Sequence, residues 1–290
     1  MRIMKMLLTV FTVGCVALLS ACFGNLGDIL GGGGSSTPAS VSGKWSIILT
    51  SNRDASNDVD LEANISQSTG SISAAQNVIL TSSPCEFGTD FLEGTVKGTN
   101  LSFTLAYGTG HPTVTFSGGV SSNGLSMTGT YKQPSGDCAS SDSGTWAATK
   151  FGDSTGTYSG QVTSNETSRV IGVTQVVQES ALNLLQVTTS LTNGGCAMLN
   201  LTGTAIGSLL QLSNADSTIT WRERASDPTY SSIAADYTIG GTSCGLADDG
   251  SGTLSNTSSN AIRAGGKSQV DPATHALFEK MLNNSKAARN

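Results

Sequence analysis

Charged residues are scarce in this chain. Only 12% of its 290 residues are Asp, Glu, Lys or Arg, about half the usual share of about 25%, so the sequence does not resemble a long helical protein with charged faces. The formal net charge is −6 at pH 7, which argues against nucleic acid as a partner, because general nucleic-acid binders are basic. Glycine is abundant instead, at 35 residues, and together with Ser and Thr it suits tight turns and exposed β-sheet faces.

Histidine is almost absent, with only His111 and His275 in the whole sequence. Two segments match the G-x-S-x-G nucleophile pattern, centred on Ser154 and Ser243. That motif needs a strand-to-helix elbow and a distant histidine with a carboxylate, and neither serine has this context. Chance matches are expected in a chain rich in Gly and Ser, so we expect no enzyme, no catalytic residue and no cofactor. A serine hydrolase is the least favoured alternative.

An apolar run at residues 7–19 is too short to span a membrane as a mature helix, and it follows the basic residues Arg2 and Lys5. This arrangement is typical of a signal peptide. The run ends in Leu19-Ser20-Ala21-Cys22, which resembles the lipobox of bacterial lipoproteins. The alternative is an ordinary secretory signal that is cleaved at Ala21.

The lipobox resemblance implies cleavage before Cys22, a diacylglycerol on its sulfur and an acyl chain such as palmitate on its amine. The partner would then be the lipid bilayer, and several acyl chains would hold the protein there permanently. The next residue is Phe23 rather than the Asp that marks inner-membrane retention. The resemblance therefore implies an outer-membrane lipoprotein of the cell envelope, with a signal peptide at residues 1–21 and a Gly/Ser-rich tether at residues 22–42.

Four cysteines remain beyond the N-terminal segment, and four allow three pairings. They are Cys85, Cys138, Cys196 and Cys244. Because each of two sequence repeats contains two of them, we expect Cys85 to pair with Cys138 and Cys196 with Cys244. Metal binding is the competing interpretation, but these cysteines form no C-x-x-C motif and have no histidine nearby.

Residues 43–150 alternate apolar and polar side chains with a period of two, which predicts strands with one buried face. About eight short strands are separated by turn signals such as Lys97-Gly98-Thr99-Asn100. This pattern predicts an all-β, antiparallel eight-stranded up-and-down meander, and closing it into a β-barrel would hide both edges. An immunoglobulin-like sandwich ranks second, because no Trp lies between Cys85 and Cys138.

The pattern returns over residues 155–256, which predicts a second, tandem eight-stranded barrel. Gly156-Thr157-Tyr158 resembles Gly43-Lys44-Trp45, and Thr163-Ser164-Asn165 repeats Thr50-Ser51-Asn52. Tyr237 precedes Cys244 by seven residues, as Tyr131 precedes Cys138. We align Gly252-Thr253-Leu254 with Gly144-Thr145-Trp146 on the same basis.

The remaining residues, 257–290, predict a Ser/Asn-rich spacer and a short amphipathic helix that starts at Asp271-Pro272. The apolar face of this helix would carry Leu277, Phe278 and Met281. The helix would rest on the second barrel or dock onto a partner.

The acidic residues 54–60 lack the spacing of a calcium loop, so we expect a solvated loop and no metal site there.

Six aromatic side chains are expected to point into the first barrel, where they would pack a core or line a ligand cavity. They are Trp45, Phe103, Tyr107, Phe116, Tyr131 and Trp146. The opening Gly-x-Trp, the Gly-Thr-Trp at residues 144–146 and the meander resemble the lipocalin and avidin superfamilies in outline. We therefore expect a non-enzymatic, membrane-tethered protein that binds a small hydrophobic or aromatic ligand or acts structurally. The alternative is an envelope protein that contacts another protein or a glycan.

Overall fold

The computed structural model describes residues 37–55, 58–80, 91–106, 113–135, 140–240, 244 and 247–258. Several predictions fall outside these residues: the signal peptide, the Cys22 anchor, most of the tether, the tail helix, Tyr107, His111, Ser243 and the Cys85–Cys138 pair. Both barrels belong to one compact unit of the chain that begins at Pro38. In the described part of the chain, no helix is long and apolar enough to cross a membrane.

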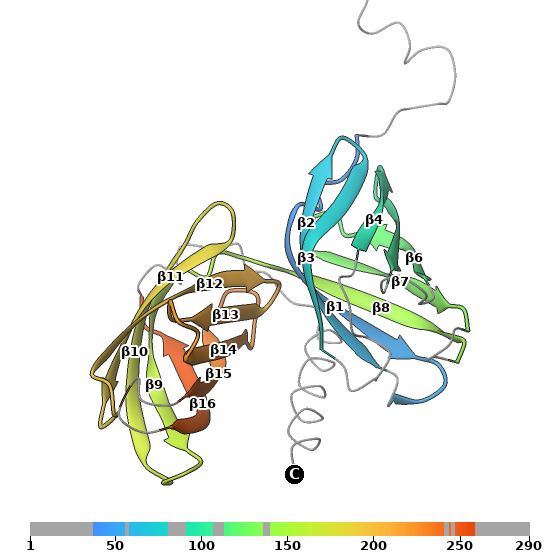
Figure 1. Ribbon diagram of the computed structural model, residues 1–290. Helices are drawn as coiled ribbons and strands as arrows, with labels where there is room; N and C mark the ends of the chain where they lie inside the picture. The colour runs from blue at the N-terminus through green and yellow to red at the C-terminus, as the bar shows by residue number, and fades with distance from the viewer. Residues whose placement is uncertain are drawn as a thin grey trace, which may run out of the picture. The chain divides into compact units, whose positions relative to one another are not determined.

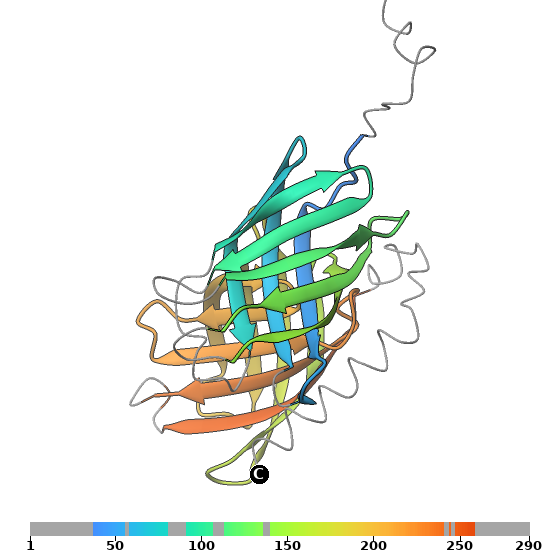
Figure 2. The same cartoon turned by 90° about the vertical axis from the view of Figure 1, so that its right-hand side faces the viewer.

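The first barrel is closed and antiparallel, with eight strands in chain order. These are β1 (Gly43–Ser51), β2 (Val59–Ser68), β3 (Ser71–Leu80), β4 (Phe91–Lys97), β5 (Asn100–Ala106), β6 (Thr113–Val120), β7 (Ser126–Gln133) and β8 (Asp142–Phe151). Neighbours in sequence are neighbours in the sheet, as the gradual colour change from β1 to β8 shows (Figure 1 and Figure 2). β1 pairs with β8 and closes the ring.

The second barrel repeats this plan with the next eight strands. They are β9 (Gly156–Ser164), β10 (Val170–Glu179), β11 (Leu184–Thr192), β12 (Met198–Ile206), β13 (Leu209–Ser213), β14 (Ile219–Ala225), β15 (Ser232–Ile239) and β16 (Asp248–Asn256). β16 pairs with β9 to close the ring. The predicted fold class of two tandem eight-stranded up-and-down barrels is therefore confirmed.

Aromatic side chains fill the first barrel. Phe103 stacks on Phe116 with ring centroids 4.2 Å apart, and Trp146 meets Phe103 edge-on at 5.3 Å. All three side chains are buried, as the alternation along β5, β6 and β8 predicts. Such aromatic contacts add to the stabilisation that burial of their area supplies.

The register of the second barrel corrects our alignment of the two repeats. Gly144 lies opposite Tyr131 and Ser51 in the first barrel, and Gly250, not Gly252, lies opposite Tyr237 and Ser164 in the second. The alignment was wrong by two residues, which leaves every side chain on its predicted face because strands have a period of two. The structural counterpart of Trp146 is consequently Gly252.

The outer face of β1 and β2 is buried, because the second barrel covers it. Asp60, Glu62 and Asn64 alternate with the inward-facing apolar residues of β2 and are at most 9% exposed. Asp60 therefore does not belong to a solvated acidic loop, as we expected, but pairs with Arg224 of β14. A charged side chain of this kind is buried only where it has a partner.

Candidate functional site

A disulfide joins Cys196, which precedes β12, to Cys244, which follows β15. Their Cα atoms are 5.0 Å apart. The bridge is the one that the sequence repeat predicts, and it ties two loops together at one end of the second barrel. We call this the disulfide end.

Each barrel contains the same triangle of polar side chains near the end of its seventh strand. In the second barrel the Asp248 carboxylate accepts hydrogen bonds from the Tyr237 hydroxyl at 2.9 Å and from the Ser164 hydroxyl at 2.6 Å. In the first barrel Asp142 accepts from Tyr131 at 2.7 Å and from Ser51 at 2.9 Å.

The pKa values of the two triangle tyrosines shift in the same direction and for the same reasons. Burial, together with the neighbouring aspartate, raises the pKa of Tyr131 and of Tyr237. A Cβ atom at Gly250 would lie 2.7 Å from the Tyr237 ring, and one at Gly144 would lie 2.8 Å from the Tyr131 ring. Glycine is therefore needed opposite each tyrosine, and both triangles hold the strands in the same register.

Beside the triangle of the second barrel lies a cavity of about 90 Å³ at the disulfide end. Its walls are mostly apolar and include Val162, Ile171, Leu191 and Ile239 together with Trp221 and Tyr237. Arg169 and Asp248 supply one positive and one negative side chain, and Gly194, Gly195 and Cys244 form the wall next to the disulfide. This volume lies well below the roughly 300 to 1,000 Å³ of sites that hold drug-sized ligands, so the cavity suits only a small molecule.

Trp221 forms part of the cavity wall and stacks on Tyr237, with ring centroids 5.3 Å apart. Its indole N–H has no hydrogen-bond partner of standard geometry in the described part of the chain, although the side chain is only 1% exposed. The indole N–H groups of Trp45 and Trp146 both donate to backbone carbonyl oxygens. Trp221 thus differs from the other two tryptophans, because a buried indole N–H usually has a partner.

A polar layer crosses the second barrel beyond Trp221. Gln175 and Thr189 lie opposite each other on β10 and β11, and Glu223 points inward from β14 on the facing wall. All three are at most 1% exposed. Among the described residues, the polar side-chain atoms of these three make no hydrogen bond of standard geometry.

Burial raises the pKa of the Glu223 carboxyl to about 8, and the Gln175 and Trp221 side chains beside it offset only part of this rise. Burial also raises the pKa of Tyr158, to which the Glu223 charge adds. An ionised carboxylate here would be a buried charge without a cation, which is strongly unfavourable. Glu223 is therefore mainly protonated at neutral pH.

The first barrel has no such layer at the equivalent positions. The shared register places Gly118 where the second barrel has Glu223, and Trp146 where it has Gly252. The Trp146 ring lies against Gly118, where a Cβ atom would come within 2.8 Å of it. An aromatic core in the first barrel is thus replaced by carboxyl, amide and hydroxyl groups in the second.

A second cluster of buried charges joins the two barrels. The Glu62 carboxylate accepts hydrogen bonds from the Ser208 backbone N–H and hydroxyl, both at 2.6 Å, and from Arg224 at 3.0 Å. Burial raises the pKa of Glu62 to about 8, the nearby Asp60 charge raises it further, and Arg224 lowers it. Gly207, beside Ser208, has a φ of +56°, and a Cβ atom there would meet the Glu62 carboxylate, so only glycine fits this turn.

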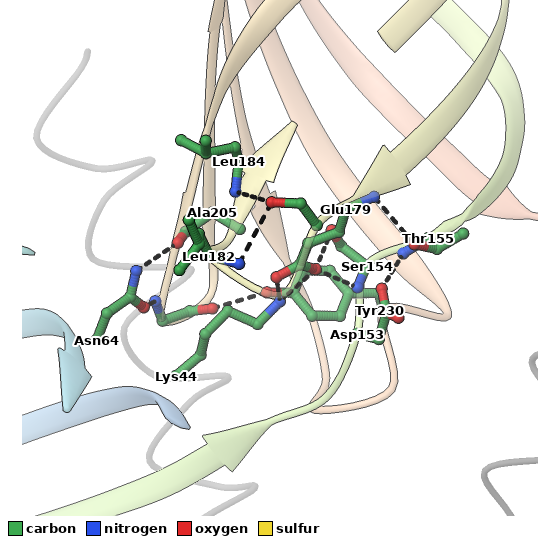
Figure 3. A network of polar contacts seen from close by, with 12 residues as sticks. Lys44, Asn64, Asp153, Ser154, Thr155, Glu179, Leu182, Leu184, Ala205 and Tyr230 are labelled. Atoms are coloured by element: carbon green, nitrogen blue, oxygen red, sulfur yellow. Dashed lines mark hydrogen bonds and ion pairs between the residues drawn. The ribbon is translucent and has the colours of Figure 1, made fainter. Parts of the chain in front are cut away.

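Lys44 of β1 forms an ion pair with Glu179 of β10 at 2.6 Å, and its ammonium group lies 4.8 Å from the centre of the Tyr230 ring (Figure 3). The Ser154 backbone N–H and hydroxyl both donate to the same Glu179 carboxylate at 2.6 Å. Burial lowers the pKa of Lys44, although the Glu179 charge opposes this effect. Ser154 is fully buried, so the serine of the first G-x-S-x-G match holds a structural carboxylate.

Most of the predicted ligand-lining aromatics that the structure describes contact one another, and Phe103 and Phe116 also line an open hollow formed with residues of β3 to β6. Phe103, Phe116, Tyr131 and Trp146 form one cluster, and Trp45 is buried elsewhere in the same core. This is the arrangement that the core-packing interpretation predicts.

Sequence reasoning missed Glu223, although the alternation of Ile219 and Trp221 points toward it. The alternation in fact continues through Glu223 to Ala225 and would have placed the carboxyl inside the barrel. It also missed the aspartates of the two triangles. Both stand two residues before the glycine opposite the tyrosine, in Asp142-Ser143-Gly144 and Asp248-Asp249-Gly250.

No family model matches this chain, and no match is found among curated proteins. Solved structures do show similarity, and two of them are as follows. One is a protein of unknown function from the DUF3598 family of Nostoc punctiforme PCC 73102, with 12% identity, coverage of 74% of this chain and 96% of that chain, and a TM-score of 0.25. The other is a candidate outer membrane protein of Bacteroides fragilis NCTC 9343, with 13% identity, coverage of 74% and 97%, and a TM-score of 0.23. We carry no function over from either protein.

Proposed function

We propose that this chain is an exported, lipid-anchored, non-enzymatic protein of the bacterial cell envelope that binds a small molecule at the disulfide end of its second barrel. The first barrel serves as a rigid structural module. The cavity beside Trp221 is the observation that carries the proposal. Its apolar walls, stacked aromatic floor and few polar groups are typical of small-molecule sites.

The contrast between the two barrels supports this assignment. Where the first barrel packs aromatic rings around Trp146, the second keeps a cavity and a buried polar layer. Buried polar groups whose hydrogen bonds are incomplete cost stability, and a core that served only as a scaffold would gain from losing them. Costs of this kind are common at functional sites, and Trp221, whose indole N–H is one of these groups, lines the cavity.

Ligand binding is tested by screening small neutral aromatic and aliphatic compounds against the purified protein and a Trp221→Phe variant. We expect compounds of a few heavy atoms to change the intrinsic tryptophan fluorescence of the wild-type protein. The same compounds should leave the emission of the variant unchanged, because its remaining tryptophans lie in the first barrel. Equal responses from both proteins, or no response across a broad panel, would exclude this site.

The lipid anchor is tested separately in bacterial cells. The protein should incorporate labelled palmitate and partition with the membrane fraction, and a Cys22→Ser variant should do neither. Separation of inner and outer membranes then tests the outer-membrane assignment that Phe23 suggests. A Cys22→Ser variant that is labelled as strongly as the wild-type protein would contradict the anchor.

Glycan binding is a second candidate function, and a hollow on the outer face of β12–β16 favours it. The hollow has a volume of about 1120 Å³, and outward-facing polar side chains line most of it. These include Thr202, Thr204, Gln211, Arg222 and Asp236. Hydroxyl, amide and charged groups are suited to hydrogen bonding with sugar hydroxyls. Binding on a glycan array that an Arg222→Ala change weakens would support this function, and an array without signal would remove it.

A further inference from the structure

The charges of the cavity point to a narrower class of ligand. Among the described residues, Arg169 and Asp248 are the only charged side chains that line it. We propose that the cavity binds a small zwitterion with adjacent ammonium and carboxylate groups, such as a short-chain α-amino acid. This inference rests on the proposed function and specifies the ligand of the same site.

Arg169 is positioned to receive the carboxylate. Its side chain is exposed at the mouth of the cavity, and among the described residues its guanidinium makes no ion pair. A guanidinium binds a carboxylate through two parallel hydrogen bonds, a geometry that a neutral acceptor does not match. An anionic group at the mouth would therefore be held in one orientation.

Asp248 is positioned to receive the ammonium group. Its two oxygens already accept from Ser164 and Tyr237, which fixes the carboxylate in place. A carboxylate has about four acceptor positions, so two hydrogen bonds leave capacity for an ammonium donor. The adjacent aromatic rings of Trp221 and Tyr237 also favour a cation over their faces.

The remainder of the cavity sets the size of the ligand. Below the charged mouth, the walls are formed by Ile171, Leu191 and Ile239 and by the Trp221 ring. A space of about 90 Å³ is several times smaller than sites for drug-sized ligands, which span roughly 300 to 1,000 Å³, so we expect a ligand with a short side chain. Alanine and 2-aminobutyrate fit this description better than leucine or phenylalanine.

Charge balance separates a zwitterion from simpler ions. An anion such as propionate would pair with Arg169 but would also face the Asp248 carboxylate. A cation such as ethylammonium would pair with Asp248 but would face Arg169. Like charges that share so small a cavity repel each other, so only a ligand with both groups satisfies both side chains.

The test is isothermal titration calorimetry of the intact, disulfide-bonded protein with alanine, propionate, ethylammonium and a neutral compound of similar size, 2-butanone. We expect alanine to bind at least tenfold more tightly than any of the other three. Arg169→Gln and Asp248→Asn should each weaken alanine binding at least tenfold, because each removes a charge-assisted hydrogen bond. Asp248→Asn keeps an acceptor for Tyr237, which protects the fold.

Matched controls are Arg222→Gln and Asp249→Asn, which remove a charge of the same sign from the same barrel at positions that do not line the cavity. Both controls should leave alanine binding within twofold of the wild-type value. If 2-butanone binds as tightly as alanine and the Arg169 and Asp248 variants have no effect, the zwitterion inference is wrong while the small-molecule function stands. If none of the four compounds binds and the fluorescence screen is also negative, the proposed function itself fails.

Discussion

Replacing Glu223 by glutamine should change how the stability of the protein depends on pH. The Glu223 carboxyl has an ordinary pKa of 4.5 when unfolded and a pKa of about 8 in the folded protein. Between these values the unfolded chain is ionised while the folded chain keeps its proton, so folding takes up a proton and loses stability as the pH rises. The loss is absent well below pH 4.5 and reaches its full size above pH 8.

The magnitude follows from the size of the shift, at about 1.4 kcal/mol per pKa unit. Because the unfolded chain ionises at Glu223 and the folded chain keeps its proton, this carboxyl lowers the free energy of unfolding. The loss is about 1 kcal/mol at pH 5, about 3 kcal/mol at pH 7 and about 4 kcal/mol at pH 8. Glutamine has the same shape as the protonated acid but no ionisable proton. The Glu223→Gln variant should therefore match the wild-type protein near pH 4 and exceed its stability by about 3 kcal/mol at pH 7.

The assay is urea denaturation of both proteins at several values between pH 4 and pH 8.5, followed by circular dichroism. Glu62 also titrates in this range, so the informative quantity is the difference between variant and wild type at each pH. Glu93→Gln, which changes an exposed glutamate on β4, provides the control and should give a difference near zero throughout. A Glu223→Gln difference that does not vary with pH would refute the conclusion that this carboxyl is buried and uncompensated.

Three further outcomes are expected from the same denaturation assay. Arg224→Met should destabilise the protein by about 3 kcal/mol at pH 8 and by less at pH 5, where Asp60 and Glu62 can take up protons. The control Arg222→Met should cost less than about 1 kcal/mol. Equal costs for the two variants would show that the ion pairs of Arg224 do not stabilise the fold. Replacing both Cys196 and Cys244 by alanine should cost about 4 kcal/mol, because the bridge closes a loop with a sequence separation of 48 residues, and an unchanged midpoint under non-reducing conditions would contradict this. Tyr131→Phe and Tyr237→Phe should each cost about 1 to 2 kcal/mol, since each removes one donor to a carboxylate, and a cost confined to one barrel would disprove the equivalence of the two triangles.

The sequence predicted the barrels well, because the period of two along each strand is a local property of neighbouring residues. The alternation of buried apolar and exposed polar residues is clear at Leu101, Phe103 and Leu105, and again in the second repeat at Val173 and Val177. The Cys196–Cys244 pair followed from the repeat for the same reason. Neither inference needed knowledge of contacts between distant segments.

The alignment error arose where the sequence offers two equivalent answers. Residues 250–254 read Gly-Ser-Gly-Thr-Leu, so two glycines two positions apart can both be aligned with Gly144 of the first repeat. Both choices leave the apolar residues on the inner face. Only the pairing of Gly250 with Tyr237 and Ser164 decides between them.

The buried charges could not be predicted, because their environment is formed by residues far away in the chain. Asp60 and Glu62 occupy outward positions that normally face water, and they are buried because Ser208 and Arg224 lie against them more than 140 positions later. The cavity likewise depends on six strands and the disulfide loops meeting at one end. Arg169, Asp248 and Trp221 are separated by up to 79 residues and show no common pattern in the sequence.

The central claim is that small molecules bind beside Trp221 and leave the first barrel unaffected. The chain has three tryptophans, so a ¹H–¹⁵N spectrum contains three indole N–H signals, one each from Trp45, Trp146 and Trp221. Titration with alanine and with a ligand from the fluorescence screen should move the Trp221 signal, while those of Trp45 and Trp146, whose N–H groups are bonded to backbone carbonyls, stay in place. A shift of the Trp45 or Trp146 signal with Trp221 unmoved would place the site in the first barrel and contradict the account.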